Sequence, residues 1–188
     1  MSQGTVRTLE TLCRVGRPTI LGHGISVDSC IASTRIGVEA LRRIGIAAGP
    51  TAVKVAAFNK EGHRAMVAGH PEWVREQRDG AYGIGIGYPT DGPGWDGHLV
   101  ITVERKWLLD LSIDQASRPE HGIVLKPFFT RRAFTSKGVM LLRIPDGGAL
   151  RYELDPDNKA YKHAPDWRLT KWGPIVKEIV AAIRGGET

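Results

Sequence analysis

A three-residue polar break between two strand-like runs constrains the fold of this chain more than any other feature. Glu104-Arg105-Lys106 separates residues 98–103 from residues 107–113, and both runs are rich in residues that favour β-strands. A break this short predicts a hairpin. A second turn signal, Pro145-Asp-Gly-Gly148, splits two further strand-like runs. The sequence therefore predicts a core sheet that is antiparallel.

Helical periodicity lies before and after these strands. Residues 31–44 carry apolar side chains at helical spacing and are followed by Gly45, a residue that often ends helices. Residues 5–16 have a similar pattern, and Gly16-Arg-Pro18 is expected to end that helix. Gly173-Pro174 is expected to open a last helix. Helices and an antiparallel sheet together predict the α+β fold class.

Cys30 stands where the helix predicted over residues 31–44 begins. The preceding Ser26-Val-Asp-Ser29 supplies side chains of the kind that cap helix N-termini. Unpaired backbone N–H groups at a helix start stabilise negative charge, and a thiol reacts as its thiolate. The position of Cys30 therefore predicts a nucleophile.

His98 and Asp110 lie in the two runs of the first predicted hairpin. If Val103 to Arg105 form the loop, His98 pairs directly with Asp110, which places their Cβ atoms about 5 Å apart. A carboxylate at that distance accepts a hydrogen bond from an imidazole, and the oriented imidazole takes the proton of a thiol. The sequence therefore predicts a triad of Cys30, His98 and Asp110.

These motifs resemble, in order and spacing, the transglutaminase-like branch of the papain-like cysteine enzymes, whose relatives include the arylamine N-acetyltransferases. The resemblance spans about residues 26–115, and it is carried by Cys30 with its helix, by Gly97-His98-Leu-Val-Ile-Thr-Val103 and by Trp107-Leu-Leu-Asp110-Leu. It implies a papain-like fold in which a nucleophile helix packs on an antiparallel sheet. It also implies that the Cys30 backbone N–H is one oxyanion donor and that no cofactor is needed.

The resemblance implies cysteine-dependent acyl transfer at a peptide or glutamine-type amide. With water as acceptor the enzyme is a protease or amidase, and with an amine it is transglutaminase-like; the substrate is a peptide, a protein or a small acyl or amide compound. Trp95 is predicted either to wall the substrate site or to cap the edge of the core. Gln115 is predicted to donate toward the substrate or toward His98, or to be an ordinary turn residue.

A non-catalytic function is the alternative hypothesis. The chain carries a formal charge of +6 and a pI near 9.5, so a binding or scaffold module that reuses the fold would offer an acidic partner a basic surface. The basic residues are dispersed, without interleaved aromatic residues or a zinc-finger motif, so nucleic-acid binding is not predicted. No Cys-x-x-Cys or His-Glu-x-x-His occurs, so no metal site is predicted.

Length and cysteine content predict the number of domains and the cellular compartment. The chain has 188 residues, of which 41% are hydrophobic, and this predicts a single domain over residues 1–188. Of the two cysteines, Cys13 lies in an apolar helical pattern and is predicted to be a buried hydrophobe. Two cysteines do not predict a disulfide framework, and no run is apolar enough for a membrane span or a secretory leader. We therefore expect a cytoplasmic protein, and the sequence does not indicate its oligomeric state.

Overall fold

The structure is a computed structural model that describes residues 3–69, 80–87 and 96–185. It confirms the predicted α+β class with an antiparallel sheet. The strands are β1 (Ala48–Phe58), β2 (Gly83–Ile86), β3 (His98–Val103), β4 (Trp107–Asp110), β5 (Phe128–Arg131), β6 (Val139–Arg143) and β7 (Ala149–Leu154). The helices are α1 (Gln3–Gly22), α2 (Cys30–Arg43), α3 (Lys60–Val67) and α5 (Gly173–Gly185), joined by short 3₁₀ turns that include η2 (Ile113–Ala116), η5 (Ala160–His163) and η6 (Pro165–Trp167).

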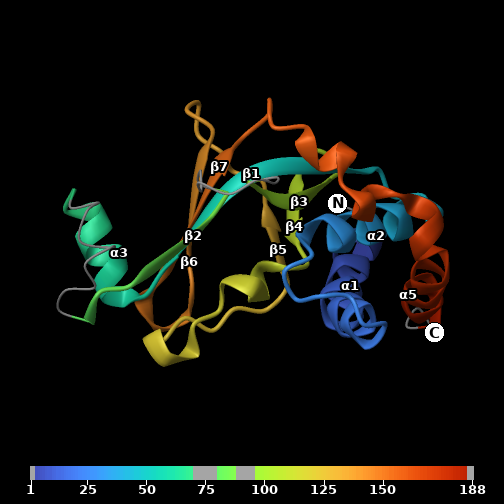
Figure 1. Cartoon of the computed structure of the whole chain (residues 1–188), viewed down its shortest axis with the longest axis horizontal. Coiled ribbons are helices and arrows are strands. Elements are labelled where there is room, and N and C mark those ends of the chain that lie inside the picture. Colours follow the sequence, from blue (N-terminus) through green and yellow to red (C-terminus); the bar gives the residue numbers. More distant parts are fainter. Residues whose placement is uncertain (1–2, 70–79, 88–95, 186–188) are drawn as a thin grey trace.

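The sheet is built around the long strand β1. The strand order is β5-β4-β3-β1-β7-β6, and β2 pairs with the second half of β1. Every pair is antiparallel, and both predicted hairpins, β3–β4 and β6–β7, are present. Figure 1 shows β1 as a long curved ribbon that passes through the middle of the molecule. The strands β5 and β6 are left as the two ends of the sheet.

The sheet separates two hydrophobic clusters. On the face that we call the helix side, Ile101, Val103 and Leu109 pack with apolar residues of α1, α2 and α5. On the opposite face, which we call the inner face, Val100 and Leu108 pack with apolar residues of β1, β6, β7 and the segment after β4. Successive residues of a strand point to opposite faces, which explains why neighbours in β3 and β4 join different clusters. Figure 1 shows α1, α2 and α5 gathered at one end of the molecule and α3 at the other.

Helix α2 lies unusually close to the sheet. A Cβ atom added to Gly37 would lie 2.6 Å from Cδ1 of Ile101 and 2.7 Å from Cδ1 of Leu111. A side chain at this position would have to displace the ends of Ile101 and Leu111, and glycine avoids that displacement where α2 packs on β3. The helix begins at Cys30, as predicted, but the Ser29 hydroxyl forms no capping hydrogen bond and lies 3.4 Å from Oδ2 of Asp166.

Helix α1 is longer than the sequence predicts. The expectation that Gly16-Arg-Pro18 ends it is wrong, because α1 continues through Pro18 to Gly22. Proline removes one backbone hydrogen bond from a helix interior, at a cost of about 3 kcal/mol. The turns around it are held by buried side chains, notably Arg17 and Ile20, and these contacts offset that cost. Within the described ranges, no helix is long and apolar enough to cross a membrane.

Candidate active site

His98 and Asp110 form a hydrogen-bonded pair inside the sheet. Nε2 of His98 lies 2.7 Å from Oδ2 of Asp110, and both side chains are fully buried. His98 is the first residue of β3 and Asp110 the last residue of β4. Side chains alternate along a strand, so both share the inner face with Val100 and Leu108. The structure therefore brings together two of the three residues of the predicted triad.

The predicted register of the hairpin is wrong, although the predicted contact is present. The loop consists of Glu104, Arg105 and Lys106 rather than Val103 to Arg105, and Ile101 pairs with Leu109. Asp110 consequently lies diagonally from His98 instead of directly opposite. Diagonal neighbours on one face are still within reach of long side chains. The shift is an even number of residues, so both side chains keep the same face.

Asp110 accepts hydrogen bonds from three groups. Besides His98, the Tyr152 hydroxyl donates to Oδ2 at 2.9 Å, and the Ser112 backbone N–H donates to Oδ1 at 3.1 Å. A buried carboxylate is tolerated only when such donors compensate for its lost hydration. Burial raises the pKa of Tyr152 well above its usual value, and the Asp110 charge and hydrogen bond raise it further, so the hydroxyl stays a donor.

Burial and Asp110 act in opposite directions on His98. Burial by itself would lower the pKa of the imidazole, because it disfavours the charged form. The charge and hydrogen bond of Asp110, with further contributions from Cys30, outweigh burial and raise the pKa of His98 to about 10. At neutral pH the ring is therefore held as an imidazolium between its neighbours.

Cys30 lies against this pair at the N-terminus of α2. Its thiol points toward the carbonyl oxygen of Gly97, the residue before His98, at 4.0 Å. After Asp110, a hydrogen bond with Cys30 and the Cys30 charge also contribute to the raised pKa of His98. The Cys30 side chain is 5% exposed. The Thr34 hydroxyl, one turn along α2, donates to the Leu99 carbonyl at 2.7 Å. This bond holds the N-terminal part of α2 against β3, so Cys30 lies close to the start of β3, where His98 and Asp110 meet.

Gln115 reaches the other ring nitrogen of His98. Its side-chain amide nitrogen lies 2.7 Å from Nδ1 of His98. This agrees with the predicted interaction with His98. In a neutral ring, Nδ1 accepts from the amide N–H; in the imidazolium, Nδ1–H donates, and the amide must turn to present its oxygen. Gln115 therefore serves both protonation states by rotating its amide.

Arg17 is a functional candidate that the sequence analysis missed. Its guanidinium is 3% exposed and pairs through Nε with the Asp114 carboxylate at 3.0 Å. It also donates to the Ser33 hydroxyl at 3.0 Å and to the Val27 carbonyl at 2.6 Å. One side chain of α1 thus holds the segment before Cys30, the first turns of α2 and the turn that carries Gln115. No local motif signals this role, because its partners are distant in sequence.

Comparison with known proteins adds no family. No protein-family model, curated protein or solved structure matches the chain. The resemblance to the transglutaminase-like branch stays a prediction.

A segment between β7 and α5 covers Cys30. Tyr161 of η5 packs against Cys30, Ala52 and Leu99, and Trp167 of η6 borders the same cluster. The rings of Tyr161 and Trp167 meet edge to face with centroids 4.8 Å apart. The Arg35 guanidinium lies 5.1 Å from the Trp167 ring centroid. These residues are the described apolar cover of the thiol; the predicted substrate residue Trp95 lies outside the described residues.

Cys13 has different surroundings. It lies in α1, half-buried against the helix-side cluster. Burial, with smaller effects of Asp110 and Glu10, raises the pKa of its thiol to about 12, so it stays protonated at neutral pH. Among the residues that the structure describes, no group of three or more His, Cys, Asp or Glu side chains could hold a metal ion.

Proposed function

We propose that this protein is a cysteine-dependent acyl-transfer enzyme with a papain-like, transglutaminase-like fold. One observation carries the proposal: a thiol at a helix N-terminus lies beside a buried imidazole whose other nitrogen is held by a carboxylate. A nucleophile, a base and a group that orients the base are the parts that nucleophilic catalysis by cysteine requires. Asp110 supplies orientation and favours the imidazolium that forms when His98 takes the thiol proton.

The chemistry proceeds in two halves. In the resting pair His98 already holds on Nδ1 the proton taken from the Cys30 thiol, and the Cys30 thiolate attacks a substrate carbonyl to give a tetrahedral oxyanion, toward which the Cys30 backbone N–H donates. The oxyanion collapses to a thioester as His98 returns the proton to the leaving amine. Water or an amine then attacks the thioester, with His98 as base, and the free thiol is restored. Gln115 must leave Nδ1 for the first transfer.

The proposed substrate is a peptide or glutamine-type amide, which undergoes hydrolysis or transfer to a second amine. The carbonyl chemistry of a thiol nucleophile supports this class. The catalysis needs Cys30 as a free thiol, and the structure has two free cysteines. A reducing compartment such as the cytoplasm suits this requirement, and we propose that the protein acts there.

A binding or scaffold module is the second candidate, and burial favours it. His98 and Asp110 are fully buried and Cys30 is nearly so. A satisfied, closed polar network of this kind also suits a module that has lost catalysis and uses its basic surface for an acidic partner. The two candidates differ in whether Cys30 accepts an acyl group.

The deciding experiment is acylation by p-nitrophenyl acetate at pH 7. Release of p-nitrophenol is followed by absorbance, and the acetylated residue is located by peptide mass spectrometry. We expect a stoichiometric burst, with an acetyl group on Cys30. The burst should persist in Cys13→Ser and vanish in Cys30→Ser, which is nearly isosteric and should retain the fold by circular dichroism. Equal labelling of both cysteines, or none, would contradict the enzyme and favour the binding module.

A further inference from the structure

A cavity of about 580 Å³ lies where the two ends of the sheet face each other. Residues of β5 and β6, together with the segments that flank them, form its walls. These are the first and last strands of the sheet order, so the sheet curls until its free edges border one space. The volume falls within the range of small-molecule sites, about 300–1,000 Å³.

The interior of the cavity is apolar. Leu125 and Leu150, both buried, and the partly buried Phe128 and Leu142 line it, and Val124 lines it while it is 60% exposed to solvent. The exposure of a large aliphatic side chain at a concave site indicates a place where burial by a ligand would be favourable. Removing each CH₂ group of such a ligand from water favours binding.

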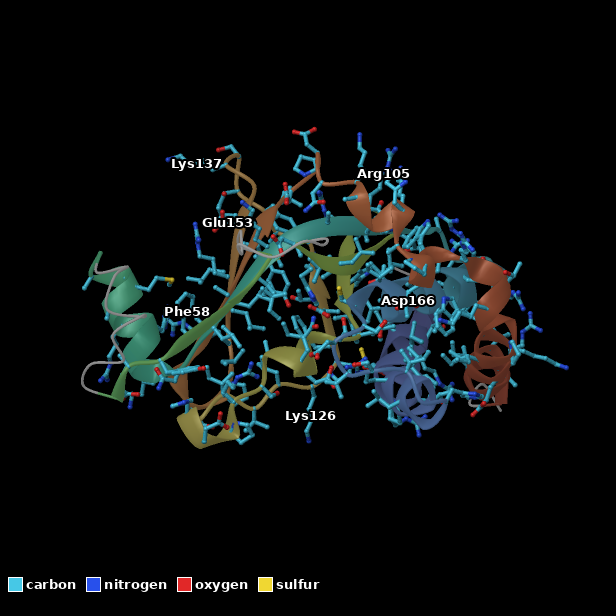
Figure 2. The ribbon with its side chains drawn as sticks, in the orientation of Figure 1. Phe58, Arg105, Lys126, Lys137, Glu153 and Asp166 are labelled. Carbon is cyan, nitrogen blue, oxygen red and sulfur yellow. The ribbon has the colours of Figure 1, made fainter. Side chains whose placement is uncertain are left out.

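The polar side chains at the cavity are mainly basic. Lys126 and Arg143 line it from opposite sides, one just before β5 and the other at the end of β6. Both are exposed, and Figure 2 shows the Lys126 side chain extending into solvent from its segment. Asp146 is the acidic residue among the lining residues that the structure describes. The two cations therefore favour a ligand with an anionic group.

Proline at both edges disfavours an added peptide strand. Pro127 precedes β5 and Pro145 follows β6, and both line the cavity. Proline lacks the N–H that would pair with an added strand, and β5 has four residues. Short edge strands flanked by proline are features that protect a sheet against strand addition. An apolar ligand without a peptide backbone fits these walls better.

We propose that this cavity binds an aliphatic carboxylate. The hydrocarbon chain packs between Phe128 and Leu142, and the carboxylate is held at the rim by Arg143 and Lys126. Cys30, His98, Asp110 and Gln115 are not among the lining residues that the structure describes, so binding does not depend on the proposed catalysis. The cavity still lies near His98 and Asp110. The ring of Phe128, which lines the cavity, packs edge-on against Tyr152, and the Tyr152 hydroxyl donates to Asp110.

The test is calorimetric titration of the full chain with decanoate, decanol and decylamine, each below its aggregation concentration. We expect decanoate to bind at least tenfold more tightly than either of the others, because only its head group complements the two cations. Arg143→Glu should weaken decanoate binding about tenfold or more. Leu142→Trp should abolish binding by filling the cavity, and its melting temperature shows whether the fold survives the larger side chain.

Two variants serve as controls. Lys137→Glu changes the net charge of the protein as Arg143→Glu does, but Lys137 lies away from the cavity, on the opposite side of the molecule from Lys126 in Figure 2. It should leave decanoate binding unchanged. Cys30→Ser should bind decanoate like the parent, which keeps this test separate from the test of catalysis. Absence of decanoate binding, equal binding of decanol, or equal weakening by Lys137→Glu would overturn the proposal, as would binding of an acidic decapeptide in place of decanoate.

Discussion

Cys13 and Cys30 lie in two regions that give a thiol opposite properties. Cys13 borders a surface cavity of about 730 Å³ beside α1, yet burial raises the pKa of its thiol to about 12. Cys30 is more deeply buried and has an imidazole and its carboxylate beside it. We therefore expect access and activation to be separated in this protein. A thiol at an open surface is predicted to be inert, and a covered thiol is predicted to react.

The largest predicted effect comes from removing the base. His98→Asn should slow alkylation of Cys30 by iodoacetamide at pH 7 by about a hundredfold or more, because a positioned base contributes roughly 10²–10⁴-fold. Alkylation of Cys13 should not change. Peptide mass spectrometry of samples quenched over time measures both rates in one protein. If Cys30 were alkylated as slowly as Cys13 in the parent protein, the predicted difference in reactivity between the two thiols would be contradicted.

Removing the carboxylate charge should have the next largest effect. Asp110→Asn keeps the shape of the side chain but no longer favours the imidazolium, so Cys30 alkylation should fall about 10- to 100-fold. The free energy of unfolding should fall by about 1–3 kcal/mol, because hydrogen bonds to a charged acceptor are lost in a buried site. Urea denaturation measures the second effect. The exposed Asp157→Asn should change neither quantity.

The stability of the protein should fall with rising pH because of His98. Its pKa is about 10 in the folded protein against 6.5 ordinarily, so between these values the unfolded chain releases a proton that the folded protein keeps. The stabilisation is complete below pH 6.5 and is lost as pH rises through 10, with a slope of about 1.4 kcal/mol per pH unit. Urea titrations from pH 6.5 to 9.5 measure this slope. The slope should disappear in His98→Asn. The measurements are made in a Cys13→Ser background, because the Cys13 thiol, whose pKa is also raised in the folded protein, would otherwise add to the slope.

Tyr152→Phe should have a smaller effect. It removes one donor from Asp110 while His98 and the Ser112 N–H remain, so the free energy of unfolding should fall by about 1–2 kcal/mol. Cys30 alkylation should slow only a few-fold. Tyr82→Phe is the matched control, because Tyr82 stacks on His121 and does not contact Asp110 in the described part of the chain. Equal effects of the two variants would show that the Tyr152 hydroxyl does not support the pair of His98 and Asp110.

The smallest effect is expected for Cys13→Ser. Alkylation at Cys30 should stay within twofold of the parent rate, because Cys13 packs in the helix-side cluster rather than in the cluster that contains Cys30, and its thiol stays neutral because burial and the Asp110 charge raise its pKa. The change replaces a half-buried sulfur, so the free energy of unfolding should fall by about 1 kcal/mol or less. Mass spectrometry and urea denaturation again measure both. A loss of Cys30 reactivity would reveal coupling between the two regions.

The contact between His98 and Asp110 was predictable because it tolerates a register shift of two residues, which leaves both side chains on the same face of the hairpin. The predicted loop was misplaced, yet a shift by an even number of residues leaves both side chains on one face. The start of α2 at Cys30 was equally local, since it follows from periodicity. Sequence reasoning succeeds where the determining pattern lies within a few residues of the site.

Tyr152 and Arg17 could not be found in this way. Tyr152 reaches Asp110 because β7 pairs with β1, and Arg17 reaches Asp114 because α1 docks beside η2. Neither pairing leaves a local pattern. The continuation of α1 through Pro18 was missed for the same reason, because buried tertiary contacts offset a local penalty that the sequence shows plainly. The part of the site that depends on packing between distant segments needs the structure.

The position of Cys30 in the chain has a consequence for synthesis. The ribosome makes α2 before β3, β4 and β7, so the thiol emerges ahead of Gly97, His98, Asp110 and Tyr152. Its cover, Tyr161 and Trp167, emerges later still. Because contacts between distant segments form only after the intervening chain exists, the nascent thiol is an ordinary cysteine while translation of this region continues. If His98 activates Cys30 as proposed, this activation waits until β3 and β4 have been made, and an incomplete chain lacks the residues of the proposed triad.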